Sequence, residues 1–95
     1  MTSIVYSSAA LEDSERLVDF LLEQSSEWAV ATFDIIDHGI SLLALHPNIG
    51  HPISGTELKE LVISRGRSGY IALYEFDPLT DQVLILAIRH QRELE

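Results

Sequence analysis

The chain has 95 residues, enough for one compact domain and too few for two. A hydrophobic content of 46% with 22% charged residues fits a folded globular protein, and the absence of cysteine excludes a disulfide framework and a thiolate metal site. The net charge of −9 argues against broad, non-specific attraction to nucleic acid or to an anionic membrane.

The first residues predict a short strand followed by a helix. Ile4-Val5-Tyr6 is a β-branched and aromatic run flanked by serines, which is typical of a strand. After it, one face of a helix is indicated by residues that recur at three- and four-residue steps: Ala10, Leu11, Ser14, Leu17, Val18, Leu21 and Leu22. We expect Ser8 to cap this helix and Asp13 to lie with the other charged residues on its outer face.

A second helix is expected to begin near Glu27, because Ser25 and Ser26 interrupt the first pattern and serine is a favoured N-cap. Its apolar stripe consists of Ala29, Phe33, Ile36, Ile40 and Leu43, and the pattern ends at His46-Pro47. The very short link between the two helices predicts an antiparallel helical hairpin. We expect Trp28 to pack within it.

The second half of the chain predicts strands. Residues 47–52 are dense in turn formers, so we expect a loop there. The period then changes to two over residues 58–64, 70–76 and 83–89, and the connectors between these runs are short. The sequence therefore predicts an α+β fold, in which an N-terminal strand and a helical hairpin pack on a C-terminal antiparallel three-stranded meander, in a single domain over residues 1–95.

Most of the basic side chains lie in the second half of the chain. Residues 1–46 hold eight carboxylates against one base, Arg16, and residues 47–95 hold seven against five, so the two halves carry −7 and −2. Arg65 and Arg67 lie in a glycine-bordered hairpin loop, where guanidinium groups can grip a phosphate or a partner carboxylate. The simpler interpretation, which we favour, is that they are solvated surface residues.

The last strand ends with Arg89, His90 and Arg92. This is the one place in the sequence where a general base, a hydrogen-bond donor and a positive charge can lie close together. A histidine there can serve acid–base chemistry beside an arginine that steadies an anion, although a structural role is the more common one. Tyr70 and Tyr74 share a strand face, so they pack in the core or present hydroxyls at its rim, and packing is favoured.

The sequence gives little indication of a metal, a cofactor or a membrane segment. His46 and His51, with His38 as an additional ligand, do not match a recognised metal-binding spacing, so we expect no metal and no other cofactor. No apolar run approaches the roughly 18 residues that span a bilayer, and MTSIVYSS lacks the pattern of a secretory signal. We therefore expect a soluble cytoplasmic protein.

Three stretches carry a family resemblance: LHPNIGHPI, ELVISRGRSGYIALYEFD and DQVLILAIRHQRE, together with YSSAALEDSERLVDFL near the start. Their order and spacing resemble the RelE/ParE toxin superfamily. The resemblance implies the same α+β layout, with the N-terminal strand joining the sheet. It also implies the toxin of a type II toxin–antitoxin, or plasmid stabilisation, system, whose partner is a cognate antitoxin.

Two branches of that superfamily differ in what they attack. RelE-like proteins cut messenger RNA in the ribosome with basic residues and a C-terminal tyrosine, whereas ParE-like proteins inhibit DNA gyrase and lack that set. Where the nucleases place lysines, this chain has Leu61 and Ile63; where they place an arginine it has Ile71, and no tyrosine follows Arg92. The resemblance therefore favours the ParE-like branch and a protein that is not an enzyme.

Two alternatives stay open at this point. One is a RelE-like, ribosome-dependent ribonuclease that uses Arg65, Arg89, His90 and Arg92 in place of the usual set. The other is a decayed toxin that only binds its antitoxin, because toxins of this family are usually basic and this chain is strongly acidic. In the leading interpretation, Arg65, Arg67, Tyr70, Arg89 and Arg92 contact the target or the partner.

Overall fold

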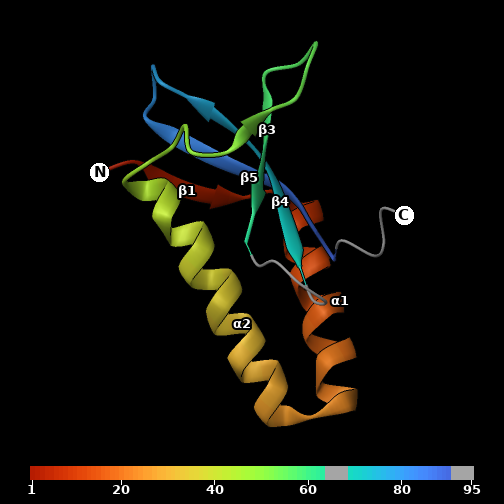
Figure 1. Ribbon diagram of the computed structural model, residues 1–95. Helices are drawn as coiled ribbons and strands as arrows, with labels where there is room; N and C mark the ends of the chain where they lie inside the picture. Colours follow the sequence, from red (N-terminus) through yellow and green to blue (C-terminus); the bar gives the residue numbers. More distant parts are fainter. Residues whose placement is uncertain (64–68, 91–95) are drawn as a thin grey trace.

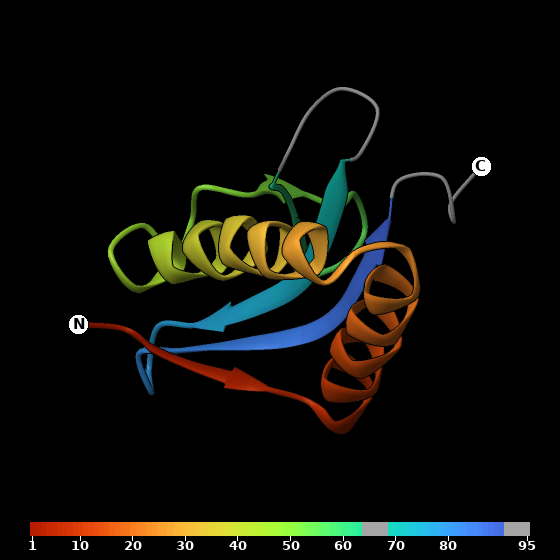
Figure 2. The ribbon, with the colours of Figure 1, turned by 90° about the horizontal axis from the view of Figure 1, so that it is seen from below.

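The computed structural model describes residues 1–63 and 69–90, in which two helices pack against one sheet (Figure 1). In chain order the elements are β1 (Ser3–Tyr6), α1 (Ser8–Gln24), α2 (Ser26–Ser41), a 3₁₀ turn η1 (Leu42–Ala44), β2 (His51–Pro52), β3 (Leu58–Val62), β4 (Tyr70–Asp77) and β5 (Gln82–His90). Figure 2 shows both helices on the same side of the sheet. The α+β class and the helical hairpin are thereby confirmed.

The strands in the described part of the chain form one sheet with the order β1-β5-β4-β3-β2. The meander β3-β4-β5 is antiparallel, and β1 joins its edge parallel to β5. The antiparallel meander and the joining of the N-terminal strand to the sheet were expected, whereas the parallel pairing of β1 with β5 was not predicted. The loop predicted over residues 47–52 is wrong at its end, because His51 and Pro52 pair with Glu60 and Lys59 as the short edge strand β2. Such a position suits Pro52, since an edge strand has one side free of ladder hydrogen bonds.

The caps and ends of the helices differ in detail from the predicted ones. Ser7, and not Ser8, caps α1, because its side chain accepts a hydrogen bond from the Ala10 N–H at 3.0 Å. Ser25, one of the two serines that the sequence offered as a cap, caps α2 and accepts from the Trp28 N–H at 3.3 Å. The second helix ends earlier than its apolar stripe suggests, and η1 continues the chain as a tighter turn that still buries Leu43.

The core lies between the hairpin and the sheet, as predicted. Its buried members are Ala10, Leu17, Ile36, Ile40 and Leu43 from the helical half and Leu61, Tyr70, Ala72, Tyr74, Val83, Ile85 and Ile88 from the strands. The helices approach the sheet closely at Gly39, where an added Cβ would lie 2.8 Å from Cγ2 of Ile63. A larger side chain at that position would push α2 away from β3.

Several side chains do not lie where the helical patterns placed them. Asp13 is buried although it was assigned to the outer face of α1, whereas Leu11, Leu22 and Phe33 from the predicted apolar faces are about half exposed. Trp28 is also half exposed, so it is less buried than a side chain packed fully within the hairpin. The buried stripe of α1 is narrower than predicted and is centred on Ala10, Asp13, Leu17 and Leu21.

A β-bulge decides which residues of β5 face the core. The partners of Leu73 and Tyr74 on β4 are Ala87 and Ile85, so Leu86 is the extra residue. The alternation of buried and more exposed side chains along β5 changes phase at this residue. Val83 and Ile85 are buried before the bulge, and Ile88 is buried after it. The bulge therefore sets the direction of the last residues of the strand, which include Arg89 and His90.

None of the helices in residues 1–63 and 69–90 is long and apolar enough to cross a membrane.

Candidate functional site

The C-terminal end of β5 has an unusual edge, because its neighbour β1 stops early. The last residue of β1, Tyr6, pairs with Ile85, and the chain then turns into α1. Polar groups at the start of α1 replace the missing strand: Ser7 N–H donates to the Ile85 carbonyl at 2.9 Å, and Ser7 Oγ donates to the Leu86 carbonyl at 3.2 Å. Nearly two helical turns further along α1, Asp13 Oδ2 accepts from the backbone N–H of Ile88 at 2.9 Å. Asp13 therefore occupies a position on the sheet edge that a strand would otherwise fill.

The same carboxylate forms an ion pair with Arg89. A second, longer contact of 3.5 Å joins it to Arg16, one helical turn away. Burial acts to raise the pKa of Asp13. The hydrogen bonds from Arg89 and from the Ile88 N–H, with the positive charges of Arg89 and Arg16, outweigh it and hold that pKa below its ordinary value. Asp13 is thus an ionised group that binds α1 to the end of β5.

Tyr70 and His90 lie opposite each other at the adjoining ends of β4 and β5. Their ring centroids are 5.1 Å apart and the rings are nearly perpendicular, at 88°, which is the edge-to-face geometry that aromatic rings favour. Tyr70 is buried and His90 is partly buried. The imidazole therefore packs on the tyrosine at the rim of the core.

The sheet brings three of the predicted site residues together. Tyr70 pairs with His90 and Ile71 pairs with Arg89, so Tyr70, Arg89 and His90 share one end of the β4–β5 ladder. Arg65, Arg67 and Arg92 lie outside the described residues. Arg89 is 38% exposed and is engaged by Asp13, and its guanidinium also donates to the Ile88 carbonyl at 3.3 Å. The ion pair with Asp13 on α1 therefore fixes the orientation of Arg89 before any target binds.

Tyr74 lies deeper in the same strand and holds the loop that precedes β2. Its hydroxyl donates to the Pro47 carbonyl at 2.8 Å and accepts from the Gly50 N–H at 2.9 Å. Gly50 approaches so closely that an added Cβ would lie 2.7 Å from this hydroxyl and 2.9 Å from the Glu60 carbonyl. Burial raises the pKa of Tyr74, and the hydrogen bond from Gly50 acts in the opposite direction with a smaller effect. Tyr70 and Tyr74 are both buried, in agreement with the packing interpretation.

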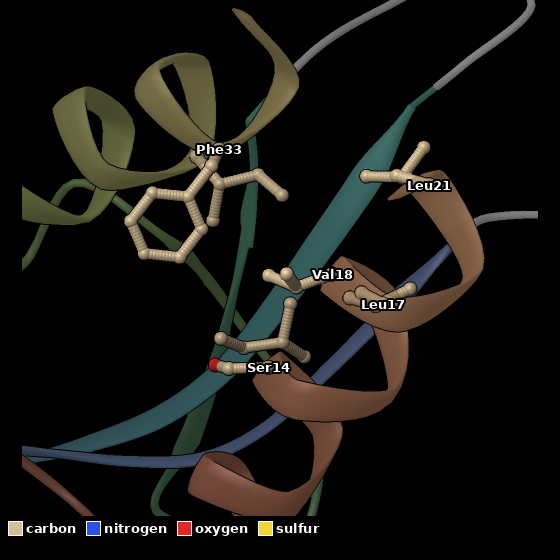
Figure 3. Close-up of a pocket in the computed structure, with 7 residues that line it drawn as sticks. Ser14, Leu17, Val18, Leu21 and Phe33 are labelled. Atoms are coloured by element: carbon tan, nitrogen blue, oxygen red, sulfur yellow. The ribbon is translucent and has the colours of Figure 1, made fainter. Parts of the chain in front are cut away.

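Sequence reasoning missed a groove between the two helices. Figure 3 shows Val18 of α1 and Phe33 of α2 facing the same space, which Ser14, Leu17 and Leu21 also line. Two open hollows of about 340 and 300 Å³ continue from it, and both are lined by Val18 and Phe33. The sequence did contain a signal for this groove. The helices hold more apolar residues than one buried stripe on each helix can accommodate, so some of them had to be exposed.

The described part of the chain contains no cluster of histidines and carboxylates that could bind a metal. No group of three or more side chains among residues 1–63 and 69–90 is arranged to hold a metal ion. His38, His46 and His51 are exposed.

Comparison with known proteins gives a family and a fold. The sequence model of the family described as "ParE toxin of type II toxin-antitoxin system, parDE" matches residues 4–95. No curated protein sequence matches the chain.

Solved structures resemble it along nearly its whole length. A chain of the chromosomal ParDE toxin–antitoxin system of P. aeruginosa is 18% identical with a TM-score of 0.75, and the match covers 95% of this chain and 96% of the other. A chain of the intact RelBE complex of E. coli is 14% identical with a TM-score of 0.64, and the match covers 93% of this chain and 94% of the other. A chain of the RelBE2 complex of Mycobacterium tuberculosis is 22% identical with a TM-score of 0.59, and the match covers 95% of this chain and 98% of the other. At such identities these likenesses show a shared fold.

Proposed function

Because this chain belongs to the ParE toxin family and is thus the toxin of a type II toxin–antitoxin system, we propose that it inhibits DNA gyrase by binding and without catalysis of its own. The observation that carries the proposal is the family match over residues 4–95. The proposed target acts in the cytoplasm, where we expect the chain to act as well.

The positions at which RNA-cutting members of the superfamily carry cations support binding over cleavage. Leu61 is a member of the buried core, and Ile63 packs against it beside Gly39. Ile71 lies within β4 opposite Arg89. RNA cleavage requires a base, an acid and positive charge at the phosphate, and apolar side chains at these places supply none of the three.

We propose that the target-binding surface is the end of the β4–β5 ladder with its adjoining segments. Tyr70, Arg89 and His90 mark this end in the structure, and Arg65, Arg67 and Arg92 are close to them in sequence. Tyr70 is buried, so it would not contact the target itself but would hold His90 in place through their ring contact. The arginines would supply the contacts, since guanidinium groups recognise carboxylates and phosphates through paired hydrogen bonds.

The experiment is a DNA supercoiling assay with gyrase and the purified chain. We expect inhibition at micromolar protein and accumulation of cleaved DNA. Arg67→Gln should weaken inhibition, whereas Lys59→Gln removes one positive charge elsewhere and should not. Full gyrase activity at saturating toxin would refute the proposal.

Partner neutralisation belongs to the same proposal. The structures that this fold resembles include complexes that their titles describe as toxin–antitoxin assemblies, ParDE and RelBE among them. We propose that a cognate antitoxin binds this chain and blocks its action. Growth arrest by the chain alone, relieved by the product of the neighbouring gene, would support this; the absence of arrest would favour a toxin that has lost its activity.

A ribosome-dependent ribonuclease is the second candidate, and the proximity of Arg89, His90 and Tyr70 is the observation that favours it. The histidine would transfer the proton and Arg89 would stabilise the phosphate. Mapping of translated messenger RNA during toxin expression separates the two candidates. Intact transcripts at a lethal dose would exclude cleavage.

A further inference from the structure

Arg16 on α1 has a different partner from the one that its helix predicts. Glu12 and Asp19 lie within about one turn of it, and a glutamate four residues before an arginine is a favoured helical pair. In the described part of the chain, however, Arg16 pairs with Asp13, at 3.5 Å from Oδ1. Arg89 of β5 contacts Oδ2 of the same carboxylate, because α1 lies beside the last part of that strand (Figures 1 and 2). The fold therefore brings two arginines, one from each half of the chain, to a single carboxylate.

This cluster of Arg16, Asp13 and Arg89 is positively charged on a strongly acidic protein. Its net charge is positive because two guanidinium groups share one carboxylate, whereas the whole chain carries −9. The Asp13 side chain is 8% exposed, while those of Arg16 and Arg89 are 49% and 38% exposed. Solvent and binding partners therefore meet the cations and not the anion. The two guanidinium groups also carry about ten N–H donors, more than the roughly four acceptor sites of one carboxylate.

An exposed aromatic side chain lies next to the cluster. Phe20 follows Arg16 by four residues, so the two are neighbours on one face of α1. Helical side chains lean toward the preceding turn, which here is the turn that holds Arg16. Phe20 is 58% exposed although it is large and hydrophobic. Arginine and aromatic residues are enriched where proteins bind one another, and they account for much of the binding energy there.

We propose that Arg16, Arg89 and Phe20 form a site, the arginine-pair site, for an acidic segment of the target protein. A glutamate or aspartate of that segment pairs with the two arginines, and an adjacent apolar side chain covers Phe20. The inference rests on the proposed function only in naming gyrase as the target. It adds a helix, α1, to a target-binding surface that otherwise consists of the end of the β4–β5 ladder and its adjoining segments.

Asp13 is a positioning residue in the arginine-pair site. It does not meet the partner, because it is buried, but it contacts both guanidinium groups. Side chains that are already held in place lose less conformational freedom when a partner binds, so their contacts contribute more to affinity. A carboxylate suits such a pair, since guanidinium groups recognise it through paired hydrogen bonds.

Nucleic acid fits this surface less well. A phosphate backbone brings a row of negative charges, and Glu12, Glu15 and Asp19 surround Arg16 along α1. These carboxylates repel further phosphates, whereas a single carboxylate can be placed between the two arginines.

The test uses the full chain and two labelled peptides of equal length. One alternates glutamate with leucine, and the other has glutamine in place of every glutamate. Binding is followed by fluorescence anisotropy at low and high salt. We expect the glutamate peptide to bind at least about tenfold more tightly, because one hydrogen bond to a charged group contributes about that factor. We expect salt to reduce the difference.

Matched variants locate the binding. Arg16→Gln and Phe20→Ser should each weaken binding of the glutamate peptide about tenfold. Lys59→Gln removes the same charge on β3, and Leu79→Ser removes an apolar side chain that is 95% exposed elsewhere, so both should bind as the parent does. Urea unfolding should give the same midpoint for Arg16→Gln and the parent, because the contact of Arg16 with Asp13 is long and half exposed. A loss of binding then reports the site and not the fold.

Three results would overturn the inference. They are equal affinity for the two peptides, equal effects of Arg16→Gln and Lys59→Gln, and tighter, Arg16-dependent binding of a labelled single-stranded oligonucleotide, which would make nucleic acid the occupant. In the supercoiling assay, Arg16→Gln should raise the toxin concentration for half inhibition about tenfold. A chain that binds the glutamate peptide through Arg16 but leaves supercoiling intact refutes the gyrase target alone. A gyrase inhibitor with no preference for the glutamate peptide refutes the arginine-pair site alone.

Discussion

Asp13 on α1 accepts a hydrogen bond from the backbone N–H of Ile88, 75 residues further along the chain, at 2.9 Å. This contact lies where β1 has ended and β5 continues, so one carboxylate satisfies a buried sheet-edge donor and pairs with Arg89 as well. Asp13 thus couples α1 to the end of β5, in addition to the hydrogen bonds that Ser7 donates to Ile85 and Leu86.

Replacement of Asp13 should be costly. Asp13→Ala leaves the buried Ile88 N–H without its acceptor, which costs about 1–3 kcal/mol, and it removes the partner of Arg89. We expect urea unfolding to show a loss of about that size. Glu12→Ala, at the exposed neighbouring position, should change stability by less than about 0.5 kcal/mol. Equal effects of the two substitutions would mean that the contact contributes nothing.

Acid should weaken this contact in a defined direction. The pKa of Asp13 lies below its ordinary value of 3.8, so its ionised form contributes stability above that value and loses it as the pH falls through the lowered pKa. Urea unfolding of the parent and of Asp13→Asn over a pH series should show a stability difference that is constant above about pH 5 and shrinks below 3.8. A difference that stays constant down to the lowest pH would contradict the assignment.

The Tyr74 hydroxyl offers a second test, because it makes two hydrogen bonds to the loop before β2. Tyr74→Phe leaves the Gly50 N–H buried and unpaired, so we expect the free energy of unfolding to fall by about 1–3 kcal/mol. Tyr6→Phe is the control, since within the described residues its hydroxyl has no hydrogen bond, and it should be near neutral. Faster amide exchange at Gly50 in Tyr74→Phe alone would confirm the mechanism.

Gly39 should tolerate alanine only when its neighbour is made smaller. Alanine favours a helix over glycine by up to about 1 kcal/mol, but a Cβ 2.8 Å from Cγ2 of Ile63 forces α2 or β3 to move. Ile63 cannot turn aside easily, because a β-branched side chain is restricted at χ1.

We therefore expect Gly39→Ala to destabilise the parent and to be neutral or stabilising in an Ile63→Ala background. A double-mutant cycle by urea unfolding measures the coupling. Additive effects would show that the two elements are not in close contact.

Much of the fold could be predicted because it depends on local patterns. Apolar residues at three- and four-residue steps indicate the helices, and alternation with short connectors predicts the meander. The same reasoning placed Tyr70 and Tyr74 in the core and Arg89 and His90 at a strand end, where the structure has them. The sequence predicted Ser8 as the cap of α1, but Ser7 is the cap. The two serines are chemically equivalent candidates, and only the backbone geometry distinguishes them.

Tertiary contacts decided the rest. Helical periodicity defines a face of the helix but not its centre, so the sequence left Asp13 on the charged side of α1, and the position of the Ile88 N–H determined that it is buried. The extra residue at Leu86 sets the direction of the end of β5, and local alternation does not contain that register. The helical patterns placed Leu22 and Phe33 on the apolar faces of the helices and did not include Val30. Only the packing of α1 against α2 shows that they border a groove, because an exposed apolar surface results from which partners a side chain finds and not from its own hydrophobicity.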